Sequence, residues 1–167
     1  MDPVIIENLK KVSFFKMFAK DNAVMEKIAG MCVQRKIKKG KTVIREGEYG
    51  DELFIIMNGQ IEILKKTIQN ELYTVTSLDA SAGGVYVGEL AMIDNDIRSA
   101  TVMAKTDCDC LIIKRNKFIK FGDENPRLGL EITRAIALQL GRNLRKTNSD
   151  VITLFSALVE EIASEEV

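Results

Sequence analysis

The segment ELFIIMNGQIEILKK, residues 52–66, decides the fold class of this chain. Two apolar, β-branched runs flank Asn58 and Gly59, which both accept a positive φ, so the segment predicts two strands joined by a type I′ hairpin turn. Similar short runs, separated by turn-forming stretches such as KKGK at 38–41 and QN at 69–70, continue through the middle of the chain. Many short strands at this spacing predict a sandwich, jelly roll or barrel.

Helical spacing of apolar residues precedes the predicted strands. Two short helices are expected, with Asp21 at the start of the second and Gly30 near its end. After Lys114 the spacing is helical again, and a short helix is expected to end at Gly122. The expected organisation is a single domain over residues 1–167, with helices over 3–31, a β roll over 32–114 and C-terminal helices over 116–165.

The C-terminal part predicts a long helix and a final one. Pro126 suits the first turn of the long helix, with Asn125 as its cap. Asn148, Ser149 and Asp150 are expected to cap the final helix. The long helix, over about 127–148, carries an apolar stripe that a β roll covers only at its start, so we expect a homodimer through this helix. The alternative is that the final helix folds back onto the stripe and leaves a monomer. The stripe consists of Ile136, Leu140, Leu144 and Val151.

Composition removes several classes of function. The 167 residues contain 24 basic and 24 acidic residues and no histidine, so the formal net charge is zero. No global positive field draws the chain onto nucleic acid or an anionic membrane, and histidine-based catalysis, metal ligation and haem ligation are excluded. Composition does not exclude sites built from cysteine or carboxylate groups. We expect a binding protein with no catalytic residues and no metal site.

The cysteines and the N-terminal segment point to a reducing compartment. Cys32, Cys108 and Cys110 are an odd number, and the CxC spacing suits buried free thiols better than a disulfide or a four-thiolate metal site. The alternative to buried core thiols is a redox role. The start MDPVIIENLKK lacks the features of a signal peptide, and no stretch approaches about 18 apolar residues. A cytoplasmic protein that does not contact a membrane is expected.

The chemically unusual residues gather in GGVYVGELAMIDNDIRSATV, residues 83–102. Gly88 allows close approach of a ligand, and Glu89 begins a predicted helical turn whose free N–H groups suit an anion. Arg98 supplies a forked donor for a phosphate, and Ser99 adds a hydroxyl. A carboxylate beside an anion site fits a ligand that has both a phosphate and a sugar hydroxyl. The alternative is a structural ion pair between Glu89 and Arg98.

This segment resembles the phosphate-binding cassette of the cyclic nucleotide-binding domain family, which includes catabolite activator proteins and regulatory subunits of protein kinase A. The resemblance extends over roughly residues 9–150. It implies a mainly β fold, a double-stranded β-helix jelly roll with N-terminal helices and a long C-terminal helix. It also implies a cAMP- or cGMP-binding regulatory domain that switches conformation with its ligand, needs no cofactor and acts on an effector protein. The matching residues are Tyr86, Gly88, Glu89, Leu90, Ala91, Arg98, Ser99 and Ala100.

The resemblance also assigns roles within the site. It implies that Glu89 bonds the ribose 2′-hydroxyl, that Arg98 pairs with the phosphate, and that the amides of Ala91 and of Ser99 or Ala100 assist. The residues that it places along the base are Val75 and Thr76 on a strand, and Thr147 and Asn148 on the long helix.

Two departures from the family pattern leave an alternative open. Asp94 and Asp96 place negative charge near the expected phosphate, so a protein-interaction or scaffold module that no longer binds nucleotide is the alternative function. About twenty residues follow the long helix, which is too few for a helix-turn-helix domain, so we expect no DNA partner.

Overall fold

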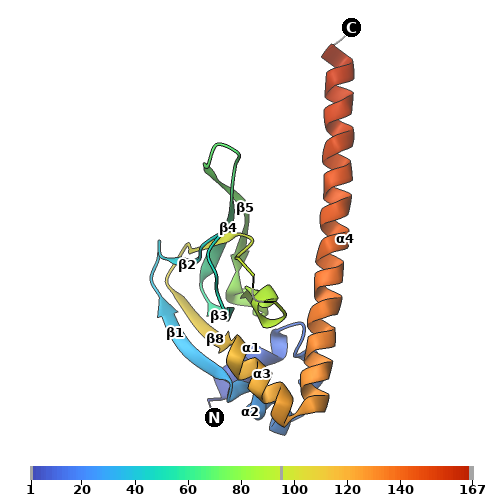
Figure 1. The fold of residues 1–167 in the computed structure, drawn as a ribbon. Coiled ribbons are helices and arrows are strands. Elements are labelled where there is room, and N and C mark those ends of the chain that lie inside the picture. The colour runs from blue at the N-terminus through green and yellow to red at the C-terminus, as the bar shows by residue number, and fades with distance from the viewer. Residues whose placement is uncertain (1, 95, 166–167) are drawn as a thin grey trace.

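Two four-stranded antiparallel sheets lie face to face in the computed structural model, which describes residues 2–94 and 96–165 (Figure 1). Their strands begin at Cys32 and end at Lys114, and the predicted jelly roll with flanking helices is confirmed. One sheet has the order β1 (Cys32–Ile37), β8 (Cys108–Lys114), β3 (Glu52–Asn58) and β6 (Val85–Val87). The other has the order β2 (Thr42–Ile44), β7 (Thr101–Ala104), β4 (Gln60–Lys66) and β5 (Leu72–Asp79).

The turn at Asn58 and Gly59 is a corner between the two sheets, so the predicted type I′ hairpin is wrong. Strand β3 pairs with β6 and β8, whereas β4 pairs with β5 and β7. Because β3 is buried on both faces and paired at both edges, it has no free edge for β4. Gly59 turns the corner with a φ of 104°, and a Cβ atom there would lie 2.6 Å from the carbonyl oxygen of Asp107.

The hairpin of the second sheet is formed by β4 and β5. Its turn contains Asn70, which has a φ of 63°, and the backbone N–H of Thr67 donates to the carbonyl of Glu71. This turn lies at the QN signal of the sequence. The hairpin extends beyond the roll (Figure 1), and its apolar residues Leu72, Tyr73 and Val75 are about half exposed.

The N-terminal helices α1 (Pro3–Lys11) and α2 (Asn22–Ala29) pack on the β1-β8-β3-β6 sheet, with a short 3₁₀ turn, η1 (Lys16–Phe18), between them. Asp21 caps α2 as predicted, because its carboxylate accepts from the N–H of Val24 at 3.1 Å. Alternate residues of β3 divide between two cores. Leu53 and Ile55 face the helices, and Phe54 and Ile56 face the other sheet.

Two helices follow the roll. Helix α3 (Arg115–Glu124) continues past Gly122, where the predicted short helix was expected to end. Gly122 packs closely against Gly129 of the next helix, since a Cβ atom on Gly129 would lie 2.6 Å from the Gly122 Cα. The absence of a side chain at Gly122 therefore allows the two helices to cross closely, and it does not mark the end of a helix.

The last element, α4 (Pro126–Glu165), is one continuous helix of 40 residues, so the predicted break at Asn148–Asp150 is wrong. Within α4, no glycine or proline follows Gly141. Asn148, Ser149 and Asp150 are exposed, so their polar side chains reach solvent without interrupting the helix. Ile132 and Ile136 are buried against the domain, but α4 then projects away from the roll (Figure 1). The large apolar residues that are exposed on α4 beyond Ile136 are Leu138, Leu144, Val151, Ile152, Leu154, Phe155, Leu158, Val159 and Ile162.

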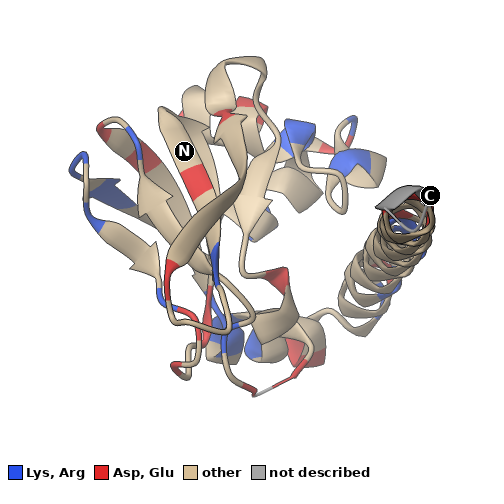
Figure 2. Ribbon diagram, turned by 90° about the horizontal axis from the view of Figure 1, so that it is seen from above, with Lys and Arg blue, Asp and Glu red and all other residues tan. Residues whose placement is uncertain are grey.

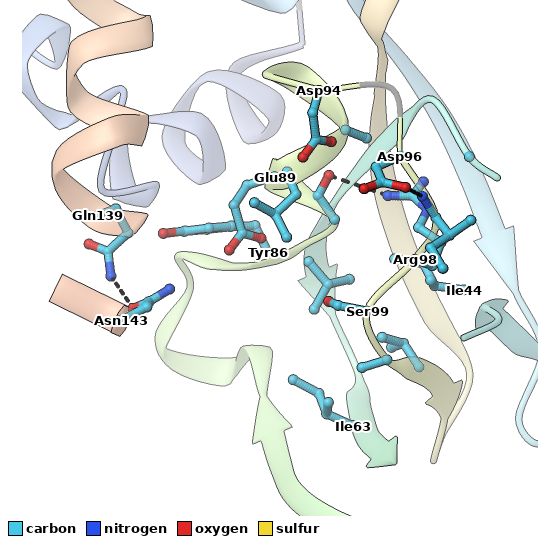
Figure 3. Close-up of a pocket in the computed structure, with 18 of the residues that line it drawn as sticks. Ile44, Ile63, Tyr86, Glu89, Asp94, Asp96, Arg98, Ser99, Gln139 and Asn143 are labelled. Carbon is cyan, nitrogen blue, oxygen red and sulfur yellow. Dashed lines mark hydrogen bonds between the residues drawn. The ribbon is translucent and has the colours of Figure 1, made fainter. Parts of the chain in front are cut away.

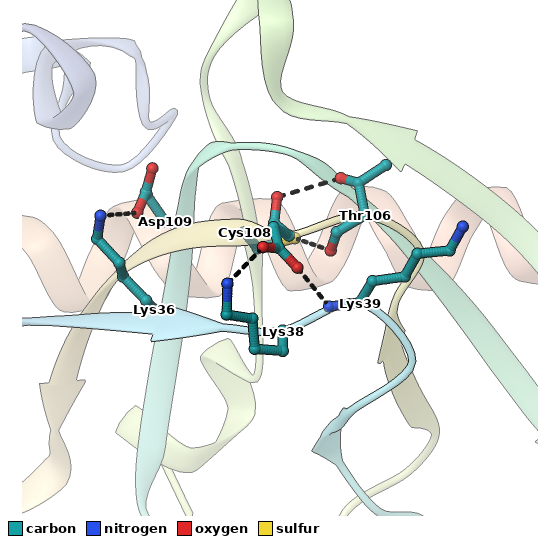
Figure 4. Close-up of polar contacts among 7 residues, drawn as sticks. Lys36, Lys38, Lys39, Thr106, Cys108 and Asp109 are labelled. Atoms are coloured by element: carbon teal, nitrogen blue, oxygen red, sulfur yellow. Dashed lines mark hydrogen bonds and ion pairs between the residues drawn. The ribbon is translucent and has the colours of Figure 1, made fainter.

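Charges of both signs are interspersed around the roll (Figure 2). The basic run that begins with Lys36 forms ion pairs between β1 and β8 (Figure 4). Lys38 donates to Asp107 at 2.7 Å, and Lys36 lies 3.7 Å from Asp109. The two carboxylates therefore offset part of the positive charge of this run.

Candidate functional site

A cavity of about 490 Å³ lies between the β roll and α4, and the 83–102 segment forms much of its wall (Figure 3). Its apolar part comes from strands of both sheets and consists of Ile44, Ile63, Leu78, Val87 and Val102. Its polar part includes Glu89, Arg98 and Ser99. An apolar cavity with a few convergent polar groups is typical of a small-molecule site.

Gly88 begins the short 3₁₀ helix η3 (Glu89–Met92), which confirms the predicted helical turn. Its φ is 85°, in the left-handed region that favours glycine. A Cβ atom on Gly88 would lie 2.7 Å from the Nη1 atom of Arg98 and 2.9 Å from the carbonyl oxygen of Glu52. The glycine is therefore required both for the backbone conformation and for the close approach of Arg98.

Arg98 lies between two glycines and donates to backbone carbonyls. Its Nη2 atom donates to the carbonyl of Glu52 at 2.6 Å, and its Nη1 atom lies 3.4 Å from the carbonyl of Gly88. A Cβ atom on Gly50 would lie 2.5 Å from its Nε atom. In the part of the chain that the structure describes, Arg98 forms no ion pair with Glu89, so the alternative of a structural ion pair is wrong.

Carboxylates surround the Arg98 guanidinium. Burial lowers the pKa of the Arg98 guanidinium below its ordinary value, and the negative charges of Glu52, Asp51, Asp94 and Glu89 oppose this shift in part. Glu89 is itself largely buried, and burial raises the pKa of its carboxyl while the positive charge of Arg98 lowers it. The site is therefore a single half-buried cation among acidic groups, which suits an anion of low charge.

Helix α4 closes one side of the cavity with two amide side chains. Gln139 and Asn143 both line it, and the Nε2 atom of Gln139 donates to the Oδ1 atom of Asn143 at 3.0 Å (Figure 3). Tyr86 lies on the same side, where its hydroxyl bonds Ser13 at 3.0 Å and its ring packs edge-on against Phe14. Tyr86 thus connects the cavity wall to the N-terminal helices.

The structure brings most of the predicted site residues together. Those that line the cavity are Gly88, Glu89, Leu90, Ala91, Arg98, Ser99 and Ala100. Val75 and Thr76 are exposed on β5 and lie outside the described wall, where Leu78 and Ile63 are found instead. Thr147 and Asn148 are also exposed and outside it. They lie about one helical turn beyond Asn143. Helix α4 has left the roll at that point, so their side chains do not line the cavity.

Several wall residues were not predicted. Gln139 and Asn143 lie three and seven positions after the buried Ile136, on the same side of the helix, and the apolar pattern had singled out only the apolar residues of this side. Gly50 was not predicted either, although its missing side chain makes room for Arg98. Asp94 and Asp96 line the cavity, as the departure from the family pattern indicated.

The three cysteines do not line the cavity. Within residues 2–94 and 96–165, no three side chains of cysteine, aspartate or glutamate come together as metal ligands. Cys32, Cys108 and Cys110 are free thiols, and burial raises the pKa of Cys32 and of Cys110 to about 12. Such thiols are poor nucleophiles. No helix in the described part of the chain is long and apolar enough to cross a membrane.

The cassette geometry agrees with a comparison to known protein families. Residues 34–125 match the family described as the cyclic nucleotide-binding domain. The chain belongs to this family. The matched segment contains both sheets apart from the first two residues of β1, and it contains the whole of the cassette.

Individual relatives show the same domain. Human cGMP-dependent protein kinase 2 is 32% identical over 111 residues, which are 66% of this chain and 14% of the kinase. The crystal structure of a cyclic nucleotide-binding domain from Methylobacillus flagellatus has a TM-score of 0.75 at 22% identity, and the match covers 89% of this chain and 81% of that one. The structure of cAMP-bound PfPKA-R has a TM-score of 0.62 at 30% identity, with 72% and 43% covered. The chain spans about 15% of the length of the curated relatives that it matches.

Proposed function

We propose that this chain is a regulatory domain that binds a cyclic nucleotide, cAMP or cGMP, in the cavity beside η3. The observation that carries the proposal is that Arg98, the turn begun by Gly88 and the carboxylate of Glu89 face one cavity. The relatives support it, because the human kinase is named for cGMP and PfPKA-R is described as cAMP-bound.

The proposed roles follow from the chemistry of each group. Arg98 exchanges its bonds to the carbonyls of Glu52 and Gly88 for bonds to the phosphate oxygens, as a forked donor does. Glu89 accepts a hydrogen bond from a ribose hydroxyl, and the backbone of Ala91, Ser99 and Ala100 adds donors. The apolar wall at Ile63 and Leu78 and the amides of α4 then face the base.

Helix α4 extends from the cavity wall to the exposed C-terminal half of the same helix. It supplies Gln139 and Asn143 to the cavity wall, and it continues for twenty-two residues beyond Asn143 as the projecting half of the same rigid helix. A ligand that contacts these amides better in one position of α4 shifts the population towards that position. The domain thereby acts as a conformational switch for signal transduction without catalysing a reaction.

Calorimetric titration of the chain with cAMP, cGMP and 5′-AMP tests the proposal. Binding of a cyclic nucleotide with one-to-one stoichiometry is expected. The linear nucleotide is expected to bind more weakly, because its phosphate carries more negative charge into a site lined by Asp94 and Asp96. Absence of binding by both cyclic nucleotides would favour the alternative, an interaction or scaffold module of the same fold.

A homodimer through α4 is part of the proposal. The dimer seam that we now expect begins after Leu140. Ile136 is buried within its own domain, and Leu140 packs partly against that same core, so neither is available to a second chain. The exposed residues Leu144, Val151 and Leu158 recur every seven positions, and so do Asn148, Phe155 and Ile162. This is the repeat of a two-stranded coiled coil, and a polar Asn in such a seam fixes its register.

Light scattering on the chain at micromolar concentration tests the dimer. A mass of about 37 kDa, twice 18.7 kDa, is expected. Val151→Glu is expected to give a monomer, because it places an unpaired charge in the seam. Lys146→Glu, a charge change on the same part of the helix, serves as the control. A monomeric wild-type chain would contradict the dimer.

The proposal also includes the location of the protein in the cell and the kind of partner that it contacts. The three free cysteines support a location in the reducing cytoplasm, and the effector is a protein that responds to the position of α4. The balanced charge supports a partner other than DNA or a membrane surface.

A further inference from the structure

Lys65 of β4 holds the end of the cassette from outside the cavity. Its Nζ atom donates to the carbonyl oxygen of Ser99 at 2.5 Å and to the Oε1 atom of Glu46 at 2.8 Å. Glu46 is fixed in turn, because its Oε2 atom accepts from the N–H of Lys66 at 3.0 Å and its own N–H donates to the hydroxyl of Thr101 at 3.1 Å. The carbonyl of Ser99 is thus linked through Lys65 to β4 and to Glu46 in the loop that follows β2.

This contact sets the direction of one peptide group. In a trans peptide the carbonyl and the following N–H point in opposite directions, and the described chain contains no cis peptide bond. Ser99 and Ala100 line the cavity, whereas the described cavity wall does not include Lys65 or Glu46. Because the Ser99 carbonyl points to Lys65, the N–H of Ala100 points away from Lys65, on a residue that lines the cavity.

We propose that Lys65 is a positioning residue, which orients the Ser99–Ala100 peptide so that the N–H of Ala100 donates to the phosphate of the ligand. The inference rests on the proposed binding of a cyclic nucleotide. Lys65 acts through the backbone and does not touch the ligand. Glu46 keeps the Lys65 ammonium in place, so the pair fixes the donor before the ligand arrives, which lowers the entropy lost on binding.

Three variants test this role. Lys65→Met removes the donor and keeps the length of the side chain, and Lys65→Arg keeps a charged donor. Lys105→Met is the matched control, because Lys105 also pairs with a carboxylate of β4, Glu62 at 2.9 Å, and has a similar exposure. The affinity for cAMP and cGMP is measured by calorimetry, and the amide signal of Ala100 is followed by NMR during the titration.

Lys65→Met is expected to bind the cyclic nucleotide about tenfold more weakly than the wild type, the loss of one hydrogen bond to a charged group. Its Ala100 amide signal is expected to shift little on binding. Lys65→Arg and Lys105→Met are expected to keep both the affinity and the large downfield shift of that signal.

Wild-type affinity in Lys65→Met, or an Ala100 shift equal to that of the wild type, would overturn the inference and leave the proposed function intact. An equal loss in Lys105→Met would also overturn it, because the effect would then be general to ion pairs on this sheet. Absence of binding by the wild type would overturn the proposed function, and the inference with it.

Discussion

Replacing Arg98 with alanine should weaken cyclic nucleotide binding about 10- to 150-fold. Hydrogen bonds to charged groups contribute about 1.5–3 kcal/mol each. In the free protein Arg98 already donates to the carbonyls of Glu52 and Gly88, so binding exchanges these bonds and does not simply add new ones. We therefore count one charged hydrogen bond as the net loss, and 1.5–3 kcal/mol corresponds to about 10- to 150-fold in affinity.

The assay is calorimetric titration of Arg98→Ala beside Arg45→Ala. Arg45 pairs with Glu48 at 3.5 Å on the surface and lies outside the described cavity wall, so its removal should leave the affinity unchanged. Thermal unfolding of both variants shows whether the fold is intact, because Arg98→Ala also leaves the carbonyl of Glu52 without this donor. Affinity of the wild-type strength in a folded Arg98→Ala variant would refute the assigned phosphate site.

Three further substitutions probe the cassette. Gly88→Ala should lower the free energy of unfolding by about 1–2 kcal/mol, because a Cβ atom is strained at a φ of 85°, and denaturant titration would detect it; unchanged stability would contradict the close approach of Arg98. Glu89→Gln should be more stable than the wild type near pH 7 yet bind more weakly. The pKa of Glu89 is raised above 4.5, so the folded state gains stability as the pH falls through that raised value, and the difference in melting temperature should disappear below pH 4.5. A difference that persists there would show that charge is not its cause. Ser99→Ala should weaken cAMP and cGMP alike, by about threefold to tenfold; in competition titrations, a loss confined to cGMP would mean that the hydroxyl contacts the guanine amino group instead of the phosphate.

The cassette was predictable because its residues are close in sequence. Gly88, Glu89, Arg98 and Ser99 lie within twelve positions, and the need for a glycine before a helical turn and for a forked cation after it can be recognised from residue types alone. The structure places all four on the cavity wall. Such a site can be recognised from the types and the spacing of neighbouring residues, and the tertiary fold then places these residues on the cavity wall.

The pairing of strands could not be predicted from local pattern. Asn58 and Gly59 suit a hairpin turn, but the turn type does not reveal that β3 is paired with β6 and β8 on its two edges. Those partners lie about thirty and sixty positions away in the chain. Strand order is set by which faces can be buried together, and that depends on the whole set of strands.

Helix α4 shows most clearly which features of the site follow from the sequence and which depend on the tertiary structure. The sequence by itself determined that a long helix with an apolar stripe follows the roll. It did not determine which turn of the helix reaches the cavity, because every turn offers a polar residue and the helix repeats every 3.6 positions. The packing of Gly129 on Gly122 and the burial of Ile132 and Ile136 fix where α4 leaves the domain. Gln139 and Asn143 face the cavity for that reason, and Thr147 and Asn148 face solvent.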